Sequence, residues 1–192
     1  MRSFDPRSVG KLECRAWETY YRRKWGPFLV ASVGLVRAAF RMNWRDTLAG
    51  AWLVLRANQK WAPFPDNDPA AARRLMTSFY RRLAASERAT FDPVRAADLD
   101  VEWWRAHREA QHNGGPGSGS AEELIGALSN LYAYTYGVDA VDVRQAAVLR
   151  AQAMDVSDSW VEAGCDPADP RLGEERALLV RSYAALLAAV HR

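Results

Sequence analysis

Apolar side chains recur every three or four residues along most of the chain. One such set contains Met76, Phe79 and Leu83, and comparable sets begin at positions 17, 44, 94 and 179. This spacing predicts amphipathic α-helices, because residues three and four apart share one face of a helix. No segment alternates apolar and polar side chains over the length of a strand between turn signals, so the sequence predicts no β-sheet.

Asp-Pro dipeptides mark where several of these helices should begin. They occur at positions 5–6, 68–69, 92–93, 166–167 and 169–170. Aspartate is a preferred N-cap, and proline suits the next position because its missing N–H is not needed there. Ser120 with Glu123 forms a capping box, and Asn43 is a further candidate cap. Gly26-Pro27 should kink or restart the helix that contains it. We therefore expect an all-α bundle of about seven helices.

A glycine- and serine-rich segment divides the chain. Residues 113–120 have the sequence NGGPGSGS, which favours a flexible linker or loop over a helix. Residues 1–112 hold 20 basic and 12 acidic side chains, whereas residues 113–192 hold 6 and 11. We expect an aromatic- and arginine-rich helical part over 1–112 and an acidic three-helix part over 121–192, packed together as one domain.

Composition excludes several classes of protein. The 192 residues carry 26 basic and 23 acidic side chains, and 49% are hydrophobic, as in an ordinary globular protein. Cys14 and Cys165 are too few for a disulfide scaffold or for a cysteine-based zinc or iron–sulfur site. The longest uncharged apolar run, residues 25–36, is shorter than the roughly 20 residues of a membrane span. With no secretory signal visible, we expect a cytoplasmic protein without a transmembrane segment.

Two adjacent tryptophans give the strongest indication of a functional site. Neighbouring residues on a helix point about 100° apart, so Trp103 and Trp104 cannot both face one core. His107 lies one turn further along, at the edge of the apolar stripe. We expect a pocket or interface in which aromatic rings and a histidine lie near arginines that contact an anion. Its predicted residues are Trp61, Trp103, Trp104, His107, Arg56 and Arg108.

The leading hypothesis is a non-catalytic module that binds a small anionic or aromatic ligand, or a protein partner. The sequence contains no Walker loop and no GxGxxG, GxSxG or HExxH motif, so no complete catalytic set is visible and no cofactor is expected. The aromatic N-terminal part also favours self-association as a homodimer. Within that part we interpret the stripe of Trp44 and Trp52 as buried core.

The residues leave two alternatives open. Glu109 and His112 form a Glu-x-x-His pair of the type that di-iron bundle proteins use. The first alternative is therefore a metal-dependent oxidase, with iron or manganese held by Glu102, Glu109 and His112. The second is a nucleic-acid binder that uses its arginines, which number 23 against 3 lysines. The absence of a helix-turn-helix, zinc-finger or RNP signature argues against the second alternative.

Overall fold

The computed structural model describes residues 3–113 and 120–192, and every regular element within them is an α-helix. The helices are α1 (Pro6–Tyr21), α2 (Trp25–Phe40), α3 (Trp44–Trp61), α4 (Pro69–Glu87), α5 (Pro93–Asn113), α6 (Ser120–Tyr136), α7 (Ala140–Glu162) and α8 (Arg171–Val190). The predicted all-α bundle is confirmed. The eighth helix arises because Gly26-Pro27 falls in the first turn of a new helix, α2. None of the described helices is both long and apolar enough to cross a membrane.

Side-chain caps begin α1, α3 and α4 at the positions that the sequence predicted, whereas the predicted cap Asp169 is not the N-cap of α8, which has no side-chain cap. Asp5 accepts a hydrogen bond from the backbone N–H of Ser8 at 3.1 Å, and Asp68 accepts one from Ala71 at 2.8 Å. Asn43 caps α3 in the same way. Each cap satisfies an N–H group that has no carbonyl partner within its helix. Local chemistry therefore fixes where these helices start.

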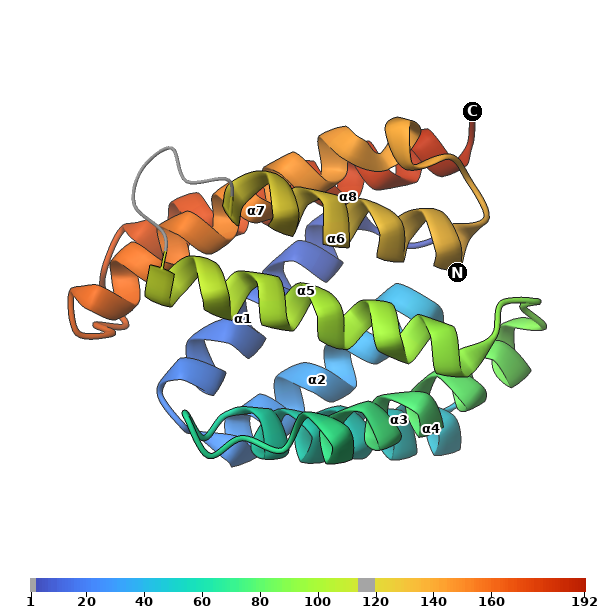
Figure 1. Ribbon diagram of the computed structural model, residues 1–192, viewed down its shortest axis with the longest axis horizontal. Helices are drawn as coiled ribbons and strands as arrows, with labels where there is room; N and C mark the ends of the chain where they lie inside the picture. Colours follow the sequence, from blue (N-terminus) through green and yellow to red (C-terminus); the bar gives the residue numbers. More distant parts are fainter. Residues whose placement is uncertain (1–2, 114–119) are drawn as a thin grey trace.

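The helices form a closed ring. Each packs against its neighbours in the chain, and α8 closes the ring by packing against α1. Figure 1 shows this ring from the side, with α3 and α4 along the lower edge, α7 and α8 along the upper edge, and α5 crossing in front of α1 and α2. The helices therefore surround one shared interior, which their side chains must fill.

The two largest hydrophobic clusters of the described residues fill most of this interior. One is built mainly from α2 to α5 and includes Met76 and Leu83, and the other is built mainly from α6 to α8 and includes Leu128 and Leu186. Trp103 packs against both clusters. The predicted Gly/Ser linker falls between the end of α5 and the start of α6, and its residues 114–119 lie outside the described residues.

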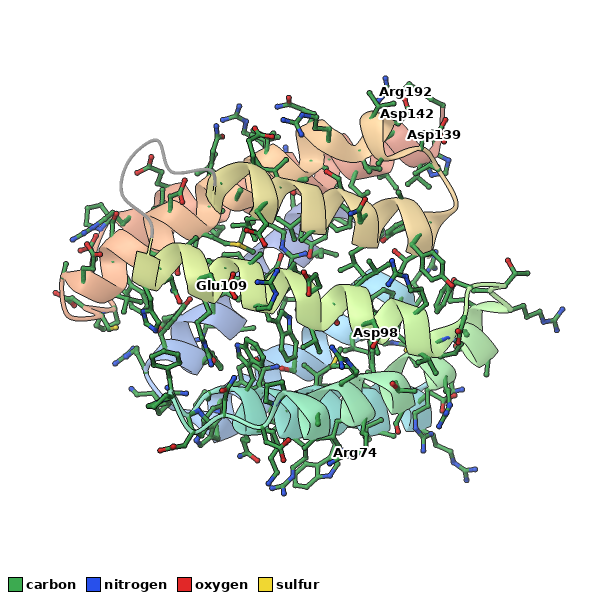
Figure 2. All side chains as sticks on the ribbon, viewed as in Figure 1. Arg74, Asp98, Glu109, Asp139, Asp142 and Arg192 are labelled. Carbon is green, nitrogen blue, oxygen red and sulfur yellow. The ribbon has the colours of Figure 1, made fainter. Side chains whose placement is uncertain are left out.

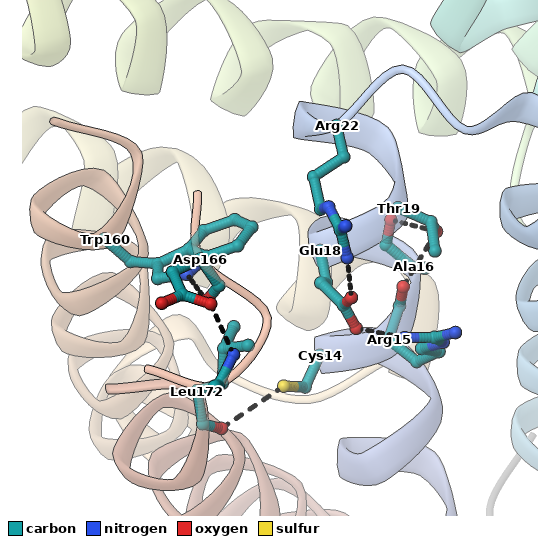
Figure 3. A network of polar contacts seen from close by, with 10 residues as sticks. Cys14, Arg15, Ala16, Glu18, Thr19, Arg22, Trp160, Asp166 and Leu172 are labelled. Carbon is teal, nitrogen blue, oxygen red and sulfur yellow. Dashed lines mark hydrogen bonds and ion pairs between the residues drawn. The ribbon is translucent and has the colours of Figure 1, made fainter. Parts of the chain in front are cut away.

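Polar contacts reinforce the place where the ring closes. Figure 3 shows α1 beside the connection between α7 and α8, where the Cys14 thiol lies 3.5 Å from the carbonyl oxygen of Leu172. The indole N–H of Trp160, a fully buried residue, donates to the carbonyl oxygen of Asp166 at 2.7 Å. At the far ends of the last two helices, Arg192 donates to the carbonyl oxygen of Asp142 (Figure 2). The Cys14 contact joins α1 to α8, the Trp160 contact joins α7 to the connection that follows it, and the Arg192 contact joins the ends of α7 and α8.

The outer face of α3 differs from the sequence-based interpretation. Trp44, Leu48 and Trp52 are 60%, 54% and 53% exposed, so the interpretation of this stripe as buried core is wrong. The helix turns a face of small residues inward instead. On that face Gly50 lies so close to Phe79 of α4 that an added methyl group would be 3.3 Å from the ring. Close approach of the two helices therefore favours burying the small face over the bulky one.

Candidate functional site

Most of the predicted site residues meet in one pocket at an end of the ring. This pocket of about 230 Å³ lies where α1, α3 and α5 end. Those helix ends lie toward the left in Figure 1. Five of the six residues predicted from the sequence line it: Trp61, Trp103, Trp104, His107 and Arg108. We call it the Arg108 pocket. The fold thus brings together residues that are up to 47 positions apart in the chain.

Arg56 lies outside the Arg108 pocket. Its side chain is exposed on α3 and donates to the side-chain oxygen of Gln59 at 3.0 Å. Arg23, which sequence analysis did not select, lines the pocket instead and donates to the carbonyl oxygen of Ala62 at 3.0 Å. It lies between α1 and α2 with a left-handed backbone, φ 54°. That conformation is uncommon for a residue with a side chain, and no turn residue in the sequence signals it.

Aromatic rings form the walls of the pocket. Trp61 meets Trp104 edge to face, with ring centroids 5.7 Å apart, and Trp103 meets Trp104 similarly at 6.1 Å. The guanidinium of Arg108 lies 4.4 Å from the centre of the Trp61 ring and 5.5 Å from that of Phe64. Phe64 is 59% exposed, which places an apolar ring at the mouth. Such walls suit a flat apolar ligand.

The prediction that Trp103 and Trp104 cannot both face one core is wrong, because both pack against the cluster built mainly from α2 to α5. Trp104 is buried in the cluster built mainly from α2 to α5. Trp103 is partly buried against both clusters, and its indole N–H donates to the Asp100 carboxylate at 2.6 Å. Each ring therefore has its own protein neighbours as well as a surface on the pocket.

The Arg108 pocket is cationic. None of the described residues that line it is acidic, whereas Arg23 and Arg108 contribute two guanidinium groups. Arg108 donates to the carbonyl oxygen of Trp61 at 2.9 Å, but in the described part of the chain no carboxylate pairs with it. Burial lowers the pKa of Arg108, because partial dehydration disfavours its charged form. An anion in the pocket would supply the missing counter-charge.

A histidine–aspartate pair lies beside the pocket. Nε2 of His107 is 3.1 Å from Oδ2 of Asp158 on α7. Gln111 donates to the other oxygen of Asp158 at 2.6 Å and to the hydroxyl of Tyr21 at 3.2 Å. The carboxylate orients the imidazole and favours a proton on Nε2. Sequence analysis did not connect Asp158 with His107, because no local spacing shows that their two helices meet here.

The three residues of the metal alternative do not come together as ligands. Arg105 forms ion pairs with Glu102 at 2.7 Å and with Glu109 at 2.5 Å (Figure 2 labels Glu109 on α5). The ring of His112 packs instead on Phe64, with centroids 4.2 Å apart. Among residues 3–113 and 120–192, no group of three or more histidine, cysteine, aspartate and glutamate side chains is placed to hold a metal ion.

Comparison with known proteins adds no assignment to this geometry. No family model, no curated protein and no solved structure matches the chain. A functional interpretation therefore depends on the contacts, burial and charge of the pocket itself.

Proposed function

We propose that the protein is a non-catalytic binding module for a small amphiphilic acid, which it holds in the Arg108 pocket. The ligand class is a flat apolar body that carries one carboxylate or phosphate group. One observation carries this proposal: an aromatic pocket contains two arginines and, among the described residues lining it, no acidic side chain.

The size and walls of the pocket set the apolar part of the ligand. A volume of about 230 Å³ exceeds the roughly 150 Å³ of a cavity that takes up benzene, and it falls below the roughly 300 Å³ at which pockets for drug-sized ligands begin. Two fused rings fit between these limits. Trp61 and Trp104 offer ring surfaces for edge-to-face or offset contact with such a body.

The arginines determine the charged part of the proposed ligand. A guanidinium donates through two parallel N–H groups, a geometry that matches a carboxylate or a phosphate. Tyr20 also lines the pocket and interacts with both Arg23 and Arg108. Burial raises the pKa of Tyr20, so its hydroxyl stays protonated and can donate a further hydrogen bond. We therefore place the acidic head group beside these three side chains.

Isothermal titration with 2-naphthoate tests the proposal. We expect saturable binding of one molecule per chain, and binding weaker by about tenfold for the uncharged analogue 2-naphthalenemethanol. Arg108→Met keeps an unbranched apolar side chain beside Trp61 but removes the charge, and should weaken 2-naphthoate binding by about tenfold or more. Arg56→Met is the matched control, since Arg56 lies on the exposed face of α3, and should leave the affinity unchanged.

Two results would reject the pocket as an acid-binding site. One is the absence of saturable 2-naphthoate binding to wild-type protein. The other is an equal loss of affinity in Arg56→Met and Arg108→Met, which would indicate diffuse attraction to a basic surface rather than a defined site. Circular dichroism of both variants establishes that they are folded.

A second candidate function is self-association through α3. Trp44, Leu48 and Trp52 lie four residues apart on this helix and are all more than half exposed, and contiguous apolar surface of this kind often marks an interface. We propose that this stripe joins two copies of the chain. Light scattering should then show a dimer that Trp44→Ser/Trp52→Ser converts to a monomer. Val141→Ser, a change at a 75% exposed residue of α7, should not do so. A monomeric wild-type protein would reject this candidate.

A further inference from the structure

A second cavity lies deeper in the ring and differs from the Arg108 pocket in its chemistry. It has a volume of about 210 Å³ and is lined by residues from all eight helices. Its polar wall contains Glu13 of α1, Asp100 of α5 and Arg150 of α7. We call it the Arg150 cavity. Its lining shares five residues with the Arg108 pocket, so the two spaces adjoin: Trp17, Phe28, Asn58, Trp103 and Trp104.

Arg150 is held by partners from three other helices. It forms a buried ion pair with Glu13, and its Nη1 donates to the hydroxyl of Tyr132 at 3.0 Å. Its guanidinium lies 4.8 Å from the centre of the Trp103 ring. Asp100 accepts hydrogen bonds from the indole N–H of Trp103 and from a tyrosine hydroxyl of α4. The charged wall of the cavity is therefore fixed in place by the protein.

Two polar atoms of this wall have no hydrogen-bond partner among the described residues. They are Nε of Arg150, a donor, and Oε2 of Glu13, an acceptor. The hydroxyl of Ser32, which also lines the cavity, has no partner among these residues either. Arg150 and Glu13 are both more than nine-tenths buried as whole residues, and both line the cavity. A buried donor or acceptor without a partner is destabilising, so a group that met both atoms would bind favourably. A hydroxyl group does so, because one oxygen both donates and accepts.

The charges of the cavity select against an ionic ligand. An anion would lie near the carboxyl groups of Glu13 and Asp100, and a cation would lie near the guanidinium of Arg150. Either would enter a site of low polarity beside a like charge. Apart from Ser32, Asn58 and Thr135, the rest of the lining is aromatic or aliphatic, which suits a flat apolar body. We infer that the Arg150 cavity is a second binding site, for a small uncharged aromatic alcohol of the phenol class. This site does not depend on acid binding in the Arg108 pocket.

Fluorine NMR with three matched probes tests the inference: 4-fluorophenol, 4-fluorotoluene and 4-fluorobenzoate. We expect 4-fluorophenol to bind saturably, one per chain, and about tenfold more tightly than 4-fluorotoluene, because only the phenol has the hydroxyl. We expect 4-fluorobenzoate not to displace it. Arg108→Met, which should weaken acid binding, should leave the affinity for 4-fluorophenol within about twofold.

The double variant Glu13→Leu/Arg150→Met removes the polar wall. Replacing both members of a buried ion pair with apolar residues of similar volume is often tolerated, so this variant is expected to fold. In it the preference for 4-fluorophenol over 4-fluorotoluene should disappear. Should it not fold, Ser32→Leu provides a second test. Ser32 is buried in the cavity lining, so the added carbon atoms should reduce the space and prevent 4-fluorophenol from binding.

Three results would overturn the inference. The first is the absence of a saturable shift for 4-fluorophenol, which would mean that the phenol does not bind at the two polar atoms. The second is equal affinity for the phenol and the toluene. The third is a preference for the phenol that persists in the double variant, or binding unchanged in Ser32→Leu, because either would place the probe elsewhere.

Discussion

Arg108 and Arg150 each place a guanidinium against a tryptophan inside the same ring of helices, yet their surroundings differ. Arg108 lies 4.4 Å from the centre of the Trp61 ring near a pocket mouth, and no carboxylate pairs with it in the described part of the chain. Arg150 lies 4.8 Å from the centre of the Trp103 ring and forms an ion pair with the buried Glu13. The described residues thus supply a counter-charge to Arg150 but not to Arg108.

This difference indicates separate roles for the two guanidinium groups: the fold pairs that of Arg150, whereas that of Arg108 is the proposed contact for an anionic ligand. A fully buried arginine is tolerated only when the fold itself provides its partner, because the cost of dehydration has to be offset in the absence of any ligand. Arg108 keeps access to water at the pocket mouth and can remain without a carboxylate until an anion arrives. We therefore expect breaking the Arg150–Glu13 ion pair to lower stability more than removing Arg108 does, and removing Arg108 to weaken the proposed binding of an acid.

The largest expected effect comes from Glu13→Gln. This change leaves the buried guanidinium of Arg150 without an anionic partner, and should lower the free energy of unfolding by about 3–5 kcal/mol. Arg108→Met removes the other arginine and leaves no buried charge unpaired, so it should cost only about 1 kcal/mol. Urea denaturation of both variants and of the wild-type protein measures the two losses.

The double variant Glu13→Leu/Arg150→Met is the control for this comparison. If the loss in Glu13→Gln arises from the unpaired charge, removing both charges should recover most of the stability. Equal losses in Glu13→Gln and Arg108→Met would show that the two arginines are stabilised in the same way, contrary to their geometry.

Helix positions could be predicted from the sequence because they depend on residues close together in the chain. The carboxylate of Asp5 caps α1 through the N–H of Ser8, three residues on, and Asp68 caps α4 over the same separation. Such local rules gave the all-α fold.

Contacts created by closing the ring could not be predicted in this way. Arg150 and Glu13 are 137 residues apart, and His107 and Asp158 are 51 apart, so no spacing rule connects them. Periodicity identified the stripe of Trp44 but could not show which side of α3 faces the interior. That choice depends on the small face that packs against α4. The sequence pattern therefore does not show which face of one helix packs against which face of another.

Two buried glutamates give a second comparison between a paired and an unpaired group, and this one concerns how stability depends on pH. Glu13 faces Arg150, whereas Glu175 of α8 is fully buried, and neither of its carboxyl oxygens has a hydrogen-bond partner among the described residues. Burial raises the pKa of Glu175 from 4.5 to about 8, with the nearby charge of Glu13 acting in the same direction. The carboxyl group of Glu175 is therefore neutral at pH 7, unlike one that is paired with a cation.

This pKa predicts that stability falls as the pH rises. Between the unfolded value of 4.5 and the folded value of about 8, the folded protein binds the extra proton, so the free energy of unfolding decreases with pH across this window and levels off above it. From about pH 6 to about pH 9 the decrease due to Glu175 should be roughly 2–3 kcal/mol. Urea denaturation at intervals across this range measures it.

Glu175→Gln should abolish most of that decrease, because the amide stays neutral at every pH. Glu174→Gln is the matched control, since the neighbouring Glu174 is exposed on the same helix and should leave the pH dependence as in the wild-type protein. A wild-type stability that stays level or rises from about pH 6 to about pH 9, or an equal slope in both variants, would mean that Glu175 is ionised in the folded protein. In that case Glu175 would be buried in its charged form, and the contrast with the ion-paired Glu13 would not hold.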